Sequence, residues 1–360
     1  MNRASYPPAA SVAKQLAEHF RHHAAQRGPD AATIERLINA AFWASLRREE
    51  GREPTISLAY VSRDDVGTAL FVEKPLPLDP DTLIKLAPAV ERPGIHLGVW
   101  PNGTDLQVWG ATRNLPAYTF VVEVIEPGLL VVKHRRAGPG GKFANVAVLQ
   151  GDDVKIIDVE GTKSTDCPDI VLTLLGFDQE ADGNDNVLLA LALSMRAHRH
   201  GGSLLVVPHG SDAWRSSILR PVPYTVAPPF AKLGQLVKSG VRDGAYRDAV
   251  DAIAGLTAVD GAVVLSDEYD VLAFGAKIVR TDSGSLLDEV LMREPIVGSV
   301  PVKVDPSELG GTRHLSAAQF VFEQHDSLAL VASQDGRFTV FGWSPRAAMV
   351  HAYRVEALLL

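Results

Sequence analysis

Two short motifs in the second half of the chain carry residue types that suit a phosphate and a metal ion. Asp260, Gly261 and Ala262 stand directly before the apolar run VVLS. A carboxylate beside a glycine at the start of a strand leaves room for a metal-bound phosphate to approach the backbone. Asp-Gly is also the commonest hairpin turn, and for Asp260 and Gly261 in isolation the turn is the favoured interpretation.

The second motif runs from Gly310 to His314 and places two glycines before a threonine, an arginine and a histidine. Two glycines leave backbone N–H groups free to face an anion, and a helix beginning just after them adds its positive end. The Arg313 guanidinium forms a fork that matches phosphate oxygens, while His314 can bind a metal or donate a hydrogen bond. A loop whose arginine pairs with a surface carboxylate explains the motif equally well.

Taken together and in this order, the two motifs resemble those of the diadenylate cyclase domain, which joins two ATP molecules into cyclic di-AMP. That family carries a DGA motif at a strand and, further along the chain, a glycine-containing loop that ends in T-R-H-R. An apolar strand and a Ser-Glu-Glu segment follow. The matching segments here are DGA at 260–262, GTRH at 311–314, LALVASQDGRFTVF at 328–341 and an opening strand in GGSLLVVP. The resemblance covers roughly residues 186–344.

This resemblance implies a role for each residue of the motifs. Asp260 would hold a catalytic Mg²⁺ or Mn²⁺ ion, and Arg313 and His314 would act on the triphosphate of ATP, with His314 also a candidate metal ligand. Further contacts to the nucleotide would come from Gly261, Ala262, Gly311, Thr312 and Ser333. Because one pocket supplies only one of the two nucleotides, the resemblance also implies a homodimer or higher oligomer.

Two of the matched segments depart from the motifs of this family. The second arginine of T-R-H-R is Leu315 here, and the Ser-Glu-Glu segment reads Ser333, Gln334 and Asp335. Losing a charged partner of a phosphate costs about 1–3 kcal/mol, enough to slow the reaction strongly. We therefore expect either a divergent cyclase with compensating residues or a catalytically impaired pseudo-cyclase that senses a nucleotide. The retained Asp260 favours the enzyme, and a scaffold used only for assembly is the third interpretation.

The second half around these motifs has the pattern of an α/β domain. Helices and strands alternate there, which predicts one mixed central sheet flanked by helices. The expected helices cover 186–200, 229–240, 244–256 and a short stretch near Ser316, and the expected strands lie in 203–208, 261–279, 328–333 and 338–344.

The first half has the pattern of an α+β domain. Ser11 is a plausible N-cap for a first helix, and Asp30 for a second with an apolar stripe along one side. Strand-type alternation and turns follow over most of the remaining sequence. The expected elements are a strand in 54–62, a short helix at 81–87, β-hairpins between 95 and 135, and a hairpin in 146–161.

The chain is expected to divide into residues 1–165, a linker at 166–185, and residues 186–360. The first of these domains resembles the DACNV-type sensor region that precedes some variant cyclase domains. Two sequence echoes also link the halves: GATRNLPAYTFVVE at 110–123 with GGTRHLSAAQFVFE at 310–323, and TDLQVWGA with YDVLAFGA. The first domain is thus a candidate degenerate copy of the second.

Overall composition narrows the classes of partner. The net charge of −8 argues against binding a nucleic-acid polymer, which needs a basic surface. The sequence has no apolar run long enough to cross a membrane and no secretory signal pattern, so we expect a cytoplasmic protein without a membrane partner. Cys167 is the only cysteine, which excludes an intramolecular disulfide framework.

Overall fold

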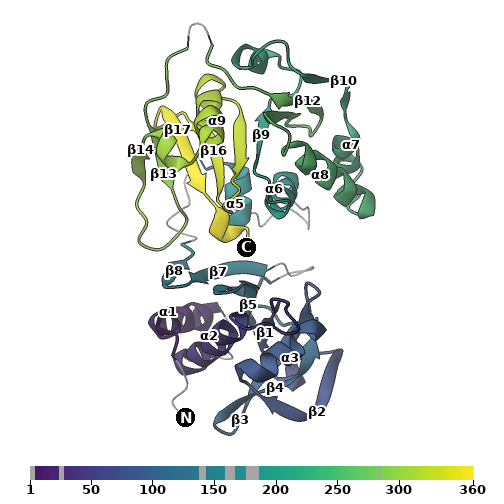
Figure 1. Ribbon diagram of the computed structural model, residues 1–360, viewed down its shortest axis with the longest axis vertical. Coiled ribbons are helices and arrows are strands. Elements are labelled where there is room, and N and C mark those ends of the chain that lie inside the picture. Colours follow the sequence, from purple (N-terminus) through teal and green to yellow (C-terminus); the bar gives the residue numbers. More distant parts are fainter. Residues whose placement is uncertain (1–4, 24–27, 138–142, 159–166, 176–185, 282–283) are drawn as a thin grey trace. The chain divides into compact units, whose positions relative to one another are not determined.

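The computed structural model describes residues 5–23, 28–137, 143–158, 167–175, 186–281 and 284–360 (Figure 1). The chain divides into two compact units, Met1–Ile157 together with Leu360, and Asp158–Leu359. These are called the first and the second unit below. The segment expected as a linker, 166–185, contains helix α5 (Asp169–Leu175), which belongs to the second unit.

The first unit is built on an eight-stranded sheet in the order β2-β4-β3-β1-β5-β6-β7-β8. Only the pair β1–β3 is parallel, and the other neighbours are antiparallel. The strands are β1 (Ser57–Tyr60), β2 (Ala69–Pro77), β3 (His96–Asn102), β4 (Asp105–Thr112), β5 (Phe120–Glu126), β6 (Leu129–Arg135), β7 (Phe143–Gln150) and β8 (Asp153–Ile156).

Three helices, α1 (Pro7–His23), α2 (Ala31–Ser45) and α3 (Pro80–Val90), pack their apolar sides against this sheet in one core. The predicted cap of α2 is confirmed, since the Asp30 carboxylate accepts a hydrogen bond from the Thr33 N–H at 2.8 Å. The predicted cap Ser11 is wrong. Helix α1 begins earlier, at Pro7, because proline suits the first turn of a helix, and the Ser11 hydroxyl donates instead to the Pro8 carbonyl.

The second unit contains a nine-stranded sheet in the order β10-β12-β11-β9-β15-β16-β17-β13-β14. Parallel pairs, β9–β11 and β13–β17, occur beside antiparallel ones, so the predicted mixed sheet is confirmed. The strands are β9 (Gly202–Val207), β10 (Tyr224–Phe230), β11 (Ala262–Ser266), β12 (Val271–Ala276), β13 (Val290–Arg293), β14 (Val302–Val304), β15 (Leu328–Ala332), β16 (Phe338–Ser344) and β17 (Met349–Arg354).

Helices flank the second sheet. Helix α9 (Thr312–Glu323) buries Ala317, Phe320 and Val321 in a core with Leu205 of β9 and Val331 of β15. Helices α6 (Val187–Ala197), α7 (Lys232–Lys238) and α8 (Gly244–Leu256) form a second group, in which α8 contacts both α6 and α7. No helix in the described part of the chain is both long enough and apolar enough to cross a membrane.

The helix expected near Ser316 begins earlier than predicted. Gly311 is its N-cap, so Thr312, Arg313 and His314 form the first helical turn rather than a loop before it. The similar sequences at 110–123 and 310–323 also fold differently. The second of these segments is helix α9, whereas the first contains the end of β4, a connection and the start of β5.

Candidate functional site

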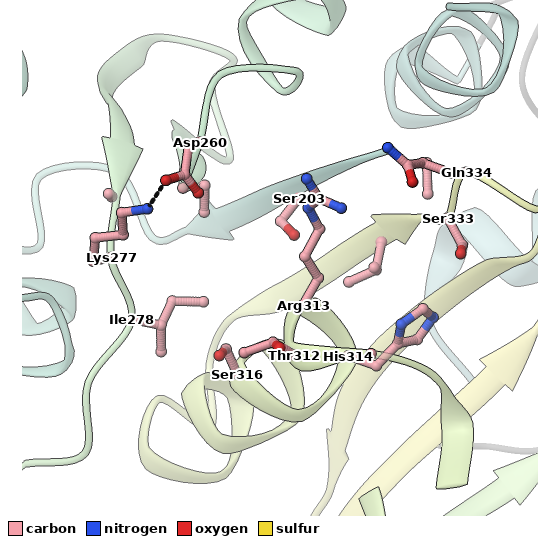
Figure 2. Close-up of a pocket in the computed structure, with 16 residues that line it drawn as sticks. Ser203, Asp260, Lys277, Ile278, Thr312, Arg313, His314, Ser316, Ser333 and Gln334 are labelled. Carbon is pink, nitrogen blue, oxygen red and sulfur yellow. Dashed lines mark ion pairs between the residues drawn. The ribbon is translucent and has the colours of Figure 1, made fainter. Parts of the chain in front are cut away.

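The two motifs meet at one pocket of about 610 Å³ in the second unit (Figure 2). Its walls come from the starts of β9 and β11, the end of β12, the first turn of α9 and the end of β15 with the turn after it. Three charged side chains line it, Asp260, Lys277 and Arg313. The pocket is of a size that suits a small organic ligand such as a nucleotide.

The first motif enters the pocket where α8 passes into β11, so Asp260 and Gly261 do not form a hairpin turn. Gly261 has φ +118°, and a Cβ there would lie 2.6 Å from the Gly275 carbonyl oxygen on β12. Only glycine fits this conformation and this close approach. Asp260 projects from the turn with 91% of its side chain exposed, so its carboxylate is accessible to a ligand.

Lys277 is a charged pocket residue that the sequence analysis missed. Its ammonium forms an ion pair with the Asp260 carboxylate, drawn in Figure 2. The hydrogen bond and charge of Lys277, with a smaller effect of Arg313, hold the pKa of Asp260 below its usual value. Lys277 directly follows β12, which runs antiparallel to β11 with Ala276 opposite Ala262. The hairpin predicted in 261–279 could have indicated this pair, because the two ends of a hairpin lie side by side and Asp260 and Lys277 stand at those ends.

The second motif forms the N-terminal end of α9, which opens on the pocket. Gly311 caps the helix without a side-chain hydrogen bond, and no atom lies within 4 Å of where its Cβ would be. The Arg313 guanidinium extends over Gly201, with Nη1 3.2 Å from the position of a Cβ there. An uncapped helix start with a neighbouring arginine provides N–H groups, a positive dipole end and a cation for an anionic ligand.

His314 lines the same pocket but is only 2% exposed. Its ring lies against Gly310, where a Cβ would be 2.7 Å from Cε1. Within the described residues, its buried Nε2 atom has no hydrogen-bond partner. Burial is the main cause that lowers the pKa of His314, so the imidazole is neutral at pH 7. A neutral ring can donate or accept a hydrogen bond, and its unpartnered Nε2 is shielded from solvent in this structure.

The predicted metal ligands Asp260 and His314 are not arranged around a common point. Figure 2 shows Arg313 between them. Among the described side chains, they do not belong to a group of three that could hold an ion together. Asp260 alone fits a Mg²⁺ or Mn²⁺ ion, because such ions commonly take one or two carboxylates and complete their coordination with water and substrate phosphates.

The last motif residues, Ser333 and Gln334, line the pocket from the turn after β15. The Ser333 hydroxyl bonds Asp335 and lowers the pKa of that carboxyl group. Asp335 itself pairs with Arg337 at 3.3 Å and does not line the pocket. Leu315 is exposed on α9 and likewise lies outside the lining. The leucine therefore removes no charge from the pocket formed by one chain.

Comparison with known proteins yields one family match, in the first unit. Residues 23–113, about a quarter of the chain, match the family described as "Probable sensor domain DACNV". This confirms the predicted resemblance of the first domain, and the match does not extend to the pocket. No curated protein matches the sequence.

Several solved structures are similar to part of the chain, among them the two that follow. One is the crystal structure of a hypothetical membrane spanning protein from Bacillus cereus, at 17% identity and a TM-score of 0.26. The match covers 46% of this chain and 61% of that one. The other is a double mutant of DacA from Staphylococcus aureus, at 14% identity and a TM-score of 0.23, covering 43% of this chain and 77% of that one. Neither likeness is close enough to assign a function.

Proposed function

We propose that the second unit binds ATP or another nucleotide in this pocket and condenses two molecules of ATP into cyclic di-AMP or a related cyclic dinucleotide. The observation that carries the proposal is the shared pocket of Asp260 and Arg313 at the open start of α9. The resemblance of the two motifs to those of diadenylate cyclases requires that these segments, distant in sequence, converge on one cleft. Both segments line the same pocket in this structure.

The proposal assigns a role to each charged residue of the pocket and to His314. Arg313 and the first-turn N–H groups of α9 bind the phosphates, and Lys277 supplies a second cation that the family motifs do not include. The buried His314 donates or accepts one hydrogen bond and holds the phosphate chain in position. Asp260 would hold Mg²⁺ or Mn²⁺, which when bound neutralises phosphate charge and lowers the barrier to phosphoryl transfer.

The reaction consists of two identical transfers. The 3′-hydroxyl of one ATP attacks the α-phosphorus of the other, so a phosphate ester bond forms, the bond to pyrophosphate breaks and the hydroxyl proton is released. The second transfer closes the ring, and the products are one cyclic dinucleotide and two pyrophosphates. Because one pocket holds one nucleotide, the proposal includes a homodimer or higher oligomer in which two pockets face each other. Positioning and charge neutralisation are the main demands of this chemistry.

The ion pair between Lys277 and Asp260 favours a second candidate, a pseudo-cyclase that senses nucleotide without converting it. The ammonium lies against the carboxylate on which the metal is expected, so an incoming ion must displace Lys277. A pocket with two cations can bind phosphates without a metal. The DACNV match supports a sensor role for the first unit under either candidate.

Incubation of the purified full chain with ATP and Mn²⁺, followed by mass spectrometry, tests the enzyme directly. We expect a cyclic dinucleotide from the wild type and from Asp248→Asn, an exposed carboxylate on α8 that serves as control. We expect none from Asp260→Asn or after removal of metal with EDTA. ATP binding in calorimetry without any product would select the sensor, and absence of ATP binding would contradict both candidates and favour a scaffold.

A further inference from the structure

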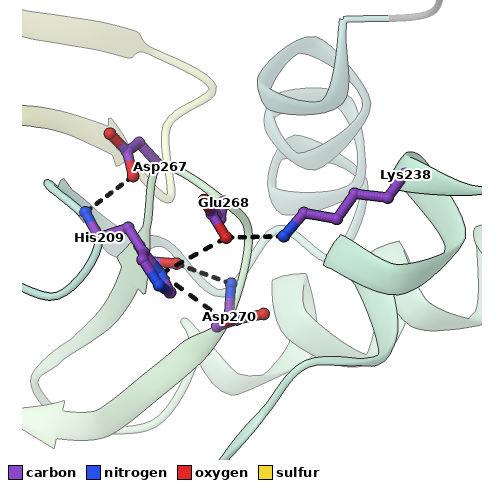
Figure 3. A network of polar contacts seen from close by, with 6 residues as sticks. His209, Lys238, Asp267, Glu268 and Asp270 are labelled. Carbon is purple, nitrogen blue, oxygen red and sulfur yellow. Dashed lines mark hydrogen bonds and ion pairs between the residues drawn. The ribbon is translucent and has the colours of Figure 1, made fainter.

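A second group of ligand-type side chains lies at the other end of the same strands. His209 follows β9, and Glu268 and Asp270 belong to the turn between β11 and β12 (Figure 3). One ligand atom from each of the three lies within 4.8 Å of the others. Since the pocket adjoins the opposite end of β11, five residues of extended strand, roughly 16 Å, separate the two places.

The backbone around this group is held by several hydrogen bonds. The His209 N–H donates to the Asp267 carboxylate, and the Asp267 N–H donates to the Val207 carbonyl, both at 2.8 Å. The Asp270 N–H donates to the Ser266 hydroxyl at 3.0 Å. These bonds tie the end of β9 to the β11–β12 turn, so the histidine and the two carboxylates come together before any ligand is bound.

The group already attracts a cation. Lys238 of α7 places its ammonium 2.7 Å from Glu268 Oε2, and this hydrogen bond lowers the pKa of Glu268. Helix α7 reaches the turn closely because Gly234 faces it, where a Cβ would lie 3.0 Å from Asp270 Oδ1. Two carboxylates and one ammonium leave a net negative charge beside the imidazole, so a divalent ion is electrostatically favoured there over the single amine.

We propose that His209, Glu268 and Asp270 bind a divalent transition-metal ion of the Zn²⁺ or Mn²⁺ type, independently of the nucleotide pocket. His209 Nδ1 lies 3.7 Å from Glu268 Oε2 and 3.9 Å from Asp270 Oδ2. Ligand atoms around a tetrahedral zinc ion lie about 3.3 Å apart, so the imidazole nitrogen needs to approach each carboxylate by only about half an ångström. An imidazole nitrogen with two carboxylate oxygens is a ligand set that suits such ions, with water completing the coordination.

Binding has a structural consequence for α7. Glu268 cannot give the same oxygen fully to the ion and to Lys238, so the ion releases the lysine from the turn. In exchange, the ion joins the segment after β9 to the β11–β12 turn. Because the ion binds the folded chain, the unfolding temperature should rise with the logarithm of the ion concentration once that concentration exceeds Kd.

Titration of the metal-free full chain with Zn²⁺ alone, followed by calorimetry and thermal unfolding, tests the site. The test is made in the Asp260→Asn background, so that the pocket carboxylate takes no part. We expect saturable one-to-one binding that His209→Ala weakens by about 10–100-fold or more. Lys238→Met, which removes the competing amine, should strengthen binding. His325→Ala removes an exposed histidine that stacks on Trp343 and should leave the affinity unchanged.

Two results would overturn the proposal. One is absence of saturable Zn²⁺ binding to the parent chain, and the other is equal affinity of the His209→Ala and His325→Ala variants. Circular dichroism of each variant without metal excludes misfolding as the cause of a loss. Asp270→Asn, which keeps the size of the side chain, is the second variant and should weaken Zn²⁺ binding as well. Failure of nucleotide conversion would not affect these results, since no nucleotide is present.

Discussion

The two units share a strand connectivity but differ in what lies at the strand ends. In each, a parallel pair forms the centre, β1–β3 in the first unit and β9–β11 in the second. Two antiparallel strands extend each pair on one side, β4 and β2 or β12 and β10. On the other side the first three strands correspond, β5-β6-β7 and β15-β16-β17, before β8 ends one sheet and β13 and β14 end the other. The second unit inserts β13, β14 and α9 before β15, whereas in the first unit β4 leads directly to β5.

The starts of the corresponding strands show the difference most clearly. In the first unit, Ser57 on β1 and His96 on β3 are buried and joined by a 2.7 Å hydrogen bond between Oγ and Nδ1. The centre of the His96 ring lies 5.3 Å from that of Phe143, so these side chains pack together at the strand starts. In the second unit, the small residues Ser203 and Ala262 border the open pocket. The pocket of the second unit is thus bordered by small residues and by the first turn of α9, an element that the second unit inserts before β15.

The comparison also bears on the predicted duplication. The echo of TDLQVWGA and YDVLAFGA falls on β4 and β12, which hold corresponding places in the two sheets. The longer echo falls on different structures, as described above. The shared strand order is consistent with a common origin of the two units. The duplication itself stays a prediction.

The largest expected effect comes from the glycines that precede β11 and β3. Gly261→Ala combines left-handed strain with a backbone clash, so we expect a loss of roughly 3–5 kcal/mol in the stability of the second unit. Gly94, with φ +80°, has no atom within 4 Å of a Cβ position, so Gly94→Ala should cost the first unit only about 1–2 kcal/mol. Urea unfolding with hydrogen exchange resolved by segment measures both. Equal losses would show that the close approach at Gly261 is not required.

The next effect concerns the two arginines of the sequence echo. Arg313→Ala removes a charged phosphate partner and should weaken ATP binding by about 10–100-fold in calorimetry. Arg113 is exposed at the corresponding place of the first unit's echo, and Arg113→Ala should leave ATP affinity unchanged. If both variants lose affinity to the same extent, the nucleotide does not bind in the α9 pocket.

The smallest effect is an acid response of the first unit. Burial lowers the pKa of His96 to about 4, below its ordinary value of 6.5. Between pH 6.5 and pH 4, His96 is protonated in the unfolded chain but neutral in the folded chain. The free energy of unfolding of the first unit therefore falls as the pH decreases. From pH 7 to pH 5.5 the loss should be about 1 kcal/mol in the first unit. His96→Gln, which cannot titrate, should lack this component in segment-resolved hydrogen exchange.

An unchanged pH dependence in His96→Gln would contradict the assignment. Burial also lowers the pKa of His314 in the second unit, so acid is expected to weaken both units in the wild type. The variant, rather than the wild-type profile, therefore separates the two contributions.

Local patterns in the sequence determined much of the fold. Asp30 is the cap of α2, the hairpin in 261–279 is β11 and β12, and the helix at 244–256 is α8. Each depends on interactions between near neighbours, which sequence shows directly. The strands that were missed include β10, with two prolines, and the short β13 and β14. These have little intrinsic strand preference and form because a neighbouring strand offers hydrogen bonds.

The sequence alone also determined which residues could meet an anion, through the glycines, Asp260 and Arg313. Only the tertiary structure decided that they converge, that Lys277 pairs with Asp260, and that His314 faces away from that carboxylate. It also decided that Ser57 pairs with His96 at the strand starts of the first unit and that His209 reaches the β11–β12 turn. The physical reason is that strand order and register set distances between residues far apart in sequence, and no local preference of the chain encodes those distances.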